Sequence, residues 1–310
     1  MNNLNVLKWI LIALLAVLTL GLVSCQSKNY ETNEHEITSS FSNISINAKE
    51  ADISFVRSDD GLCKVTCYEH KKEKHAVKIS GDTLTIEIVD EKKWYEHIAI
   101  NTESPKIVIA LPEAQYGLLN VKSSTGDITV DRGLGFESID LSLTTGDVNC
   151  YASAKGGVSI DLTTGDINLE GLSAGLIKLE STTGDVKLSN VSVSEEVTLE
   201  VSTGEVTLER VSCRSLTSNG TTGSIALKNV IATGTISIDT TTGDVNFVNS
   251  DAGELYIKVT TGDVEGNLLT DKVFITKTNT GDVSVPASII GGRCEITTTT
   301  GNISITVSNN

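Results

Sequence analysis

The stretch Ser124-Thr125-Gly126-Asp127-Ile128 recurs along the chain, and this recurrence decides the fold class. Its glycine returns every 19 or 20 residues and always follows a threonine, which makes ten copies of one unit. The ten glycines are Gly126, Gly146, Gly165, Gly184, Gly204, Gly223, Gly243, Gly262, Gly281 and Gly301. A fixed period of this size is typical of repeat proteins, in which each unit packs on its neighbours.

Apolar and polar residues alternate on both sides of the repeated glycine. The residue seven positions before the glycine is apolar in every copy, and the residue two positions after it is always Val or Ile. Polar residues such as Asp140 and Asn149 lie between the apolar ones. Alternation with a period of two is typical of β-strands, so each copy is predicted to be a strand, a tight turn, a second strand and a return segment.

One repeat is too short to enclose its own apolar side chains. Copies stacked at ~4.8 Å would bury continuous columns of Val, Ile and Leu and would pair each backbone group with the copy above or below. Parallel crossover connections are right-handed in nearly all proteins. We therefore predict an all-β chain that forms a right-handed parallel β-helix, or β-solenoid, with about ten coils over residues 119–310. An irregular β-rich cap is expected before it, over residues 41–118.

The N-terminus has the character of an export signal. Residues Trp9 to Val23 carry no charge, and the run ends in Leu22-Val23-Ser24-Cys25, which resembles the lipobox of bacterial lipoproteins. Residues 1–25 are predicted to be a signal peptide whose Cys25 receives a lipid, or alternatively an uncleaved signal anchor. Residues 26–40 are polar and are predicted to form a tether. Both alternatives place the protein outside the cytoplasm and attach it to a membrane.

The other five cysteines do not have the spacing of a disulfide framework or of a metal site. Cys63 and Cys67 are four residues apart in a predicted strand, which puts them too far apart for a disulfide bond. Cys150 and Cys294 occupy positions that other repeats fill with apolar residues, so they are predicted to be buried thiols. Cys213 is expected in a loop between strands.

The repeated glycine and the residue after it have predicted roles in the turn. Glycine allows a positive φ at little cost, and an aspartate after it can accept hydrogen bonds from backbone N–H groups of the turn. The alternative is that Ca²⁺ ions lie along the aspartates, which are Asp127, Asp147, Asp166, Asp185, Asp244, Asp263 and Asp282. Ser224 and Asn302 interrupt this series, which favours hydrogen bonding because a continuous file of ions would need its ligands in every coil.

Charge and residue distribution exclude several classes of function. The formal net charge is −16, and the region from residue 119 onward contributes most of it. Such a protein is repelled by nucleic acids, so none is expected as a partner. All four histidines precede the repeats, and the segment 70–75 is predicted to be a solvated loop. The constant spacing leaves no insertion that could form a cleft, so we predict a non-enzymatic protein without a cofactor. A polysaccharide-active β-helix enzyme is a remote alternative.

The lipobox, the β-rich cap, the Leu111-Pro112 entry and the repeated Thr-Gly-Asp-[Ile/Val] motif together resemble a bacterial domain-of-unknown-function family named "putative adhesin". The resemblance extends over residues 41–307 and implies a β-solenoid on the cell envelope that binds or displays. It implies an envelope protein or a surface glycan as the partner, and a role in envelope-stress sensing or scaffolding as the alternative. It provides no catalytic residues.

The last predicted strand, Ile303 to Val307, has no following sequence to cover it. An uncovered strand edge exposes unpaired backbone groups. We therefore expect this C-terminal edge to be covered by the N-terminal segment, by self-association or by a partner.

Overall fold

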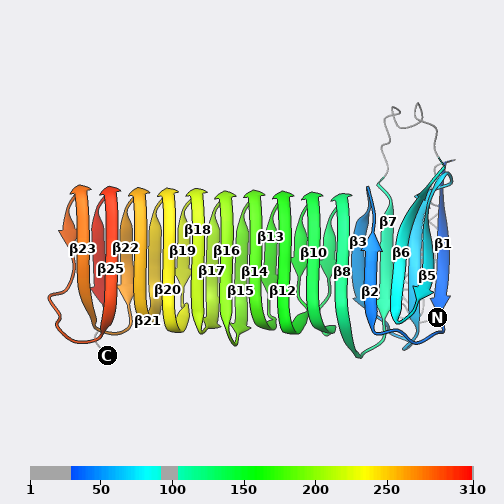
Figure 1. Ribbon diagram of the computed structural model, residues 1–310, viewed down its shortest axis with the longest axis horizontal. Helices are drawn as coiled ribbons and strands as arrows, with labels where there is room; N and C mark the ends of the chain where they lie inside the picture. Colours follow the sequence, from blue (N-terminus) through cyan, green and yellow to red (C-terminus); the bar gives the residue numbers. More distant parts are fainter. Residues whose placement is uncertain (1–28, 92–103, 309–310) are drawn as a thin grey trace, which may run out of the picture.

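The computed structural model describes residues 29–91 and 104–308, and all of its regular structure is β. The predicted signal peptide and its lipidation residue, Cys25, lie outside the described residues. In the part of the chain that is described, no helix is long and apolar enough to cross a membrane. The strands lie side by side along a rod, with β1 (Tyr30–Ile37) at one end and β23 (Lys272–Thr280) at the other (Figure 1). The predicted parallel β-solenoid is confirmed.

Two columns of parallel strands meet at the repeated glycines. The column before the glycines is formed by β8 (Gln115–Thr125), β10 (Gly135–Thr145), β12 (Ser153–Thr164), β14 (Ser173–Thr183), β16 (Glu196–Thr203), β18 (Ser215–Thr222), β20 (Ile231–Thr242), the end of β21 (Val245–Thr261), β25 (Gly292–Thr300) and β23. The column after them is formed by β9 (Ile128–Val130), β11 (Val148–Cys150), β13 (Ile167–Glu170), β15 (Val186–Val193), β17 (Val206–Cys213), β19 (Ile225–Lys228), the start of β21, β22 (Val264–Leu268), β26 (Ile303–Val307) and β24 (Val283–Ser284).

The register between coils stacks equivalent residues on one another. Ile139, for example, pairs with Leu119 in the preceding coil and with Val158 in the next. All three side chains are buried in the single core that runs along the rod. Burying one such side chain contributes about 1.5–3 kcal/mol, so the apolar columns are the main source of stability.

The regular coils begin earlier than residue 119. In the first coil, β2 (Asn43–Asn47) and β3 (Asp52–Arg57) pair in parallel with β8 and β9. The boundary predicted between cap and solenoid at residues 118 and 119 is therefore wrong. The segment Ala51-Asp52-Ile53 keeps the apolar spacing of the repeat although it lacks the glycine, and this spacing is enough to place Ile53 opposite Ile128.

The remaining N-terminal strands close the end of the rod with antiparallel pairs. β6 (Thr83–Asp90) and β7 (Lys106–Leu111) lie parallel to β2 and β3. Outside them, β5 (Glu73–Ser80) pairs antiparallel with β6, and β4 (Cys63–His70) pairs antiparallel with β7. We call β1 and β4 to β7 the cap. Its reversed strands interrupt the parallel stacking at this end.

The predicted tether at residues 26–40 is wrong where the structure describes it, because Tyr30–Ile37 is strand β1. This strand pairs antiparallel with β4 over its whole length, from Tyr30 opposite His70 to Ile37 opposite Cys63. One polar side chain of this strand has a buried polar partner on β4, because Asn33 donates a hydrogen bond to Glu69. Polar composition alone therefore concealed a paired strand.

The last two coils are stacked in reversed order. β25 pairs with β21 on one side and with β23 on the other, and β26 lies in the same way between β22 and β24. Figure 1 shows β23 beyond β25 at the end of the rod. The expectation that Ile303 to Val307 forms the open edge is therefore correct only for Ile305 to Val307, because β23 is outermost and β24 pairs with Ile303 and Ser304 alone.

A close backbone approach explains the reversal. A Cβ atom on Gly292 would lie only 1.7 Å from the carbonyl oxygen of Gly253, so the coil stacked directly on Gly253 needs a glycine at this position. The coil of β23 has Lys272 there. Lys272 is buried one layer further out, where its Nζ lies 2.6 Å from the Asp251 carboxylate.

The repeated glycine is required for two reasons. Its φ is positive in every copy, between 103° and 151°. In addition, a Cβ atom on any of the ten glycines would lie 1.8–2.3 Å from a carbonyl oxygen of the adjacent coil. The turn therefore demands glycine both for its dihedral angle and for the spacing between coils.

Replacing one corner glycine is expected to destabilise the rod much more than replacing a turn glycine that has free space. Gly184→Ala should cost about 2–5 kcal/mol, because the unfavourable φ adds to a backbone clash. Gly81→Ala also has a positive φ, but no atom lies within 4 Å of the added Cβ, so about 1–2 kcal/mol is expected. Thermal unfolding of both variants tests this, and equal losses would contradict the clash.

Candidate functional site

The aspartates of the repeated motif form a ladder of hydrogen bonds between coils. The backbone N–H of Asp147 donates to Oδ1 of Asp127, and that of Asp166 donates to Oδ1 of Asp147, both at 2.9 Å. The same bond recurs from Asp127 to Asp52, Asp185 to Asp166, Glu205 to Asp185, Asp263 to Asp244 and Asn302 to Asp263. The aspartates therefore accept from the neighbouring coil, whereas the sequence predicted an acceptor for the turn of the same coil.

Two residues that replace aspartate in the ladder, Ser224 and Asn302, keep its geometry. The N–H of Asp244 donates to Oγ of Ser224 at 3.3 Å, and that of Asp282 donates to Oδ1 of Asn302 at 3.0 Å. A neutral oxygen can therefore replace the carboxylate oxygen, which explains why the sequence tolerates Ser and Asn at this corner. Calcium binding along the aspartates of the motif stays a prediction. In most of these aspartates, one carboxylate oxygen already accepts a hydrogen bond from the backbone of the neighbouring coil.

The C-terminal end of the rod exposes a group of apolar side chains. Ile289 is 93% exposed and Ile290 is 64% exposed, in the segment that leads from β24 back to β25. Val273 and Ile275 on β23 and Val283 on β24 are exposed as well. We call these five residues the apolar end. Several large apolar side chains exposed at one end of a protein are candidates for a contact surface.

The outermost strand at this end is also poorly protected against pairing. Its outward-facing residues include only one charge, Lys277. At the opposite end, β1 exposes Glu34 and Glu36. Charges on an edge strand prevent another strand from adding to it. Among the described residues the two ends of the rod therefore differ, and the edge strand at the C-terminal end is the less protected one.

A shallow groove crosses the outer face of the first coils. Its volume is about 590 Å³, and its lining includes the exposed side chains of Leu118 and Leu176 together with Asp140 and Lys155. The groove lies where β12 has an irregular register around Gly157. It gives the rod a second surface, on its side, that combines apolar and charged groups.

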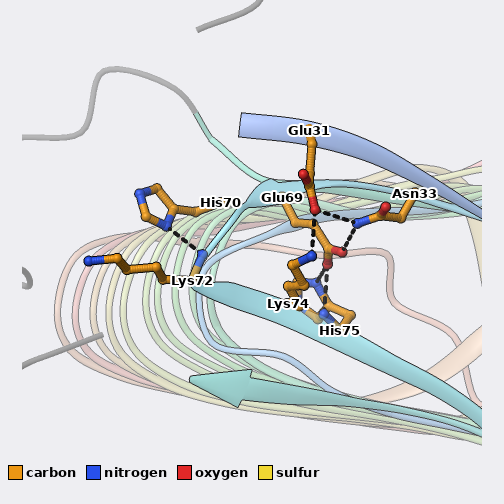
Figure 2. A network of polar contacts seen from close by, with 7 residues as sticks. All are labelled: Glu31, Asn33, Glu69, His70, Lys72, Lys74 and His75. Atoms are coloured by element: carbon orange, nitrogen blue, oxygen red, sulfur yellow. Dashed lines mark hydrogen bonds and ion pairs between the residues drawn. The ribbon is translucent and has the colours of Figure 1, made fainter. Parts of the chain in front are cut away.

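A buried polar network occupies the cap. Glu69 is almost fully buried, and its Oε2 accepts hydrogen bonds from the backbone N–H of His75 at 2.6 Å and lies 2.9 Å from Nδ1 of His75. Its Oε1 accepts a hydrogen bond from Asn33 at 2.7 Å. Figure 2 shows these three side chains pointing toward one another from β1, β4 and β5. Burial alone would raise the pKa of Glu69, but hydrogen bonds from His75 and Asn33 outweigh it and lower that pKa.

The segment 70–75 is therefore not the solvated loop that the sequence predicted. Only residues 71 and 72 form a turn, while Glu73 and His75 are buried on β5. The alternation along β4 contained the missed signal, because Cys63, Val65, Cys67 and Glu69 occupy one face. His75 lies on β5, shortly after the turn at residues 71 and 72, so its side chain can contact this face of β4.

All five described cysteines are buried and form no disulfide bond. Burial raises the pKa of Cys150 to about 12, and burial and the charge of Glu69 together raise that of Cys67 to about 12. These thiols are therefore protonated at neutral pH and are poor nucleophiles. Cys213, expected in a loop, is buried at the end of β17.

A family model described as Toastrack DUF4097 matches residues 41–199 and 194–310. This chain belongs to the Toastrack family. The match begins at residue 41, before strands β2 and β3, so it includes the first coil of this Toastrack chain as well as the glycine repeats. No curated protein matches the chain.

Several solved structures are similar to this Toastrack chain at low identity. A "putative adhesin" from Bacteroides fragilis is 16% identical, with a TM-score of 0.46 over 91% of this chain and 99% of the other. A "putative lipid binding protein" from Parabacteroides distasonis is 16% identical, with a TM-score of 0.38 over 90% and 98%. A "putative adhesin" from the same species is 11% identical, with a TM-score of 0.41 over 91% and 98%.

Substitutions of Asp166 separate the hydrogen-bond ladder from a file of calcium ions. Asp166→Ala removes the acceptor for the N–H of Asp185 and is expected to cost about 0.5–1.5 kcal/mol. Asp166→Asn keeps an acceptor oxygen and removes one of several neighbouring negative charges, so its melting temperature should equal or exceed that of the wild type.

The control is Asp161→Asn, which removes an exposed charge from the outer face of β12 without touching the ladder. Thermal unfolding of all variants is measured with calcium and with a chelator. If calcium is bound along the column, the chelator lowers the wild-type melting temperature and Asp166→Asn loses stability only when calcium is present.

Proposed function

We propose that this Toastrack chain is a non-enzymatic binding or display module of the cell envelope, and that it makes contact through its apolar end. The observation that carries the proposal is the exposure of Ile289 and Ile290 near an edge strand that has a single exposed charge, Lys277. Terminal repeats of a solenoid need a polar outer face to remain soluble alone. An apolar terminal coil therefore indicates that a partner covers it.

The membrane attachment predicted at the N-terminus is consistent with an apolar end that faces away from the membrane. The described chain begins beside β1, at the end of the rod opposite β23 (Figure 1). Eleven coils at ~4.8 Å place the apolar end on the order of 50 Å from the first coil. A lipid or signal anchor near Cys25 would then hold the cap near the membrane and present the apolar end away from it, outside the cytoplasm.

The same features favour binding over catalysis. The described cysteines are buried thiols, and His75 is buried in the cap with Glu69. The repeat period stays constant from Gly126 to Gly301, so neighbouring coils form a continuous wall. The binding surface proposed at the end of the rod consists of residues, such as Ile289 and Ile290, that lie outside the repeated pattern.

The partner class is an envelope protein or a surface glycan, and self-association is a specific alternative. Two copies could pair their β23 strands antiparallel about a twofold axis at Ile275. Lys277 would then lie opposite Val273 of the partner copy, so the exposed charges of the two strands would not face each other. Such a contact would join two rods end to end.

Retention of envelope components by the full chain in detergent tests the proposal. The double variant Ile289→Ser and Ile290→Ser should weaken retention about 10–100-fold, because burial of each isoleucine contributes about 1–2 kcal/mol to a contact. Leu62→Ser, at an exposed leucine in the loop before β4, is the matched control and should retain normally.

The identity of what is retained separates the alternatives. Retained glycan supports adhesin-like binding, a retained envelope protein supports sensing or scaffolding, and a concentration-dependent dimer in sedimentation supports self-association. Retention that is unchanged in the isoleucine variant would contradict contact through the apolar end.

Lipid attachment is tested separately. Acyl labelling in the native bacterium should mark the wild-type chain and should disappear in Cys25→Ala, because the thiol of Cys25 would be the acceptor. Cys63→Ala is the control, since Cys63 is buried on β4 and should leave labelling unchanged. Unlabelled wild-type protein would leave the signal anchor as the means of attachment.

A further inference from the structure

Three side chains of the kinds that bind metal ions converge inside the cap. Cys67 and Glu69 lie on the same face of β4, and His75 faces them from β5. Each offers one ligand atom, and these atoms all lie within 4.8 Å of one another. All three residues are buried. Atoms bound to one tetrahedral metal ion, at 2.0–2.3 Å from it, lie about 3–4 Å apart, so the observed grouping needs only small movements to reach that geometry.

Within the described part of the chain, one atom of this group lacks a partner. Nδ1 of His75 lies 2.9 Å from Glu69, but Nε2 of His75 is buried without a hydrogen-bond partner. The imidazole is 2% exposed, so water does not readily satisfy that nitrogen. Buried polar atoms in native proteins are nearly always paired. The hydrogen bonds among the described residues therefore leave a ring nitrogen of this buried cluster unused.

We propose that Cys67, Glu69 and His75 bind one divalent transition metal ion, and that Zn²⁺ is the ion that fits best. Thiolate and imidazole ligands favour zinc, whereas calcium and magnesium prefer oxygen ligands. The thiolate and the carboxylate together balance the two charges of the ion, which makes a neutral site inside the core. Three protein ligands leave a fourth coordination position open.

The proton balance of binding is simple. The thiol of Cys67 loses its proton to solvent as the metal–sulfur bond forms, and Glu69 binds as a carboxylate. His75 binds through an unprotonated nitrogen, and its other nitrogen keeps the single proton of the neutral ring. Binding therefore releases one proton from the thiol, and the affinity should rise with pH.

Neighbouring groups are placed to orient the ligands. Asn33 donates a hydrogen bond to Oε1 of Glu69, and the backbone N–H of His75 donates to Oε2. Hydrogen bonds of this kind fix the orientation of metal-binding carboxylates. Because Asn33 belongs to β1, the ion would connect the three outermost strands of the cap, which are β1, β4 and β5. This role is independent of contact at the apolar end.

Cobalt binding to the full chain in detergent, after removal of metals, tests the site. Co²⁺ is expected to bind at one equivalent per chain and to produce the near-ultraviolet charge-transfer band of a cobalt–thiolate bond. Zn²⁺ should displace the cobalt and raise the melting temperature of the cap. Cys67→Ser should abolish the band, and Cys63→Ser, which alters a second buried thiol on the same face of β4, should keep it.

Two further variants keep the test informative if Cys67→Ser disturbs the cap. Glu69→Gln and His75→Gln retain the thiol and should each weaken Co²⁺ affinity by ~10-fold or more. Absence of the thiolate band in the wild type, or metal binding that is unchanged in Cys67→Ser, would overturn the proposal and leave a purely hydrogen-bonded network.

Discussion

The close approach of neighbouring coils at the glycine corner is the constraint on which the rod depends. At Gly184, the carbonyl oxygen of Gly165 lies 1.9 Å from the place of a Cβ atom. This contact fixes the distance between neighbouring coils at the glycine turn. It also brings each following N–H within reach of the aspartate oxygen in the neighbouring coil, as in the pair of Asp185 and Asp166 at 2.8 Å. The glycine and the aspartate of the motif therefore act together to hold neighbouring coils at this distance.

The same constraint acts where the repeat becomes irregular. Gly292 lies against the backbone at Gly253, whereas Lys272 occupies the corresponding position in the preceding repeat of the sequence. The coil with a glycine is thus the one stacked at this close backbone contact, and the coil with the lysine lies beyond it. The reversal leaves the strand β23 outermost, and with it the exposed Ile275. The apolar end is therefore a consequence of the stacking order.

The coils could be predicted from the sequence because their signal is local and repeated. Alternation and the recurring glycine specify strands, corners and columns without knowledge of distant contacts. The order of the last two coils could not be predicted, because both have the same apolar columns and differ at a contact with Gly253. Strand β1 was missed for a related reason: Asn33 and Glu31 are polar toward a partner that is polar as well. The cap cluster needed the pairing of β4 and β5 to bring His75 to Glu69.

The coils bury nearly identical columns of apolar side chains, so apolar stacking alone would allow similar coils to stack in any order. Residues that do not repeat must therefore select one arrangement, and the buried charged groups lie where they can do so. Lys272 forms an ion pair with Asp251 near one end of the rod, and buried Glu69 is hydrogen-bonded to His75 near the other. Buried polar and charged pairs contribute little net stability, but leaving one partner unpaired is strongly unfavourable. A misplaced end coil or cap strand would leave such a group unpaired, so these pairs act against wrong arrangements. The repeated core supplies the stability of the rod, and the polar groups at its ends determine where the stacking begins and stops.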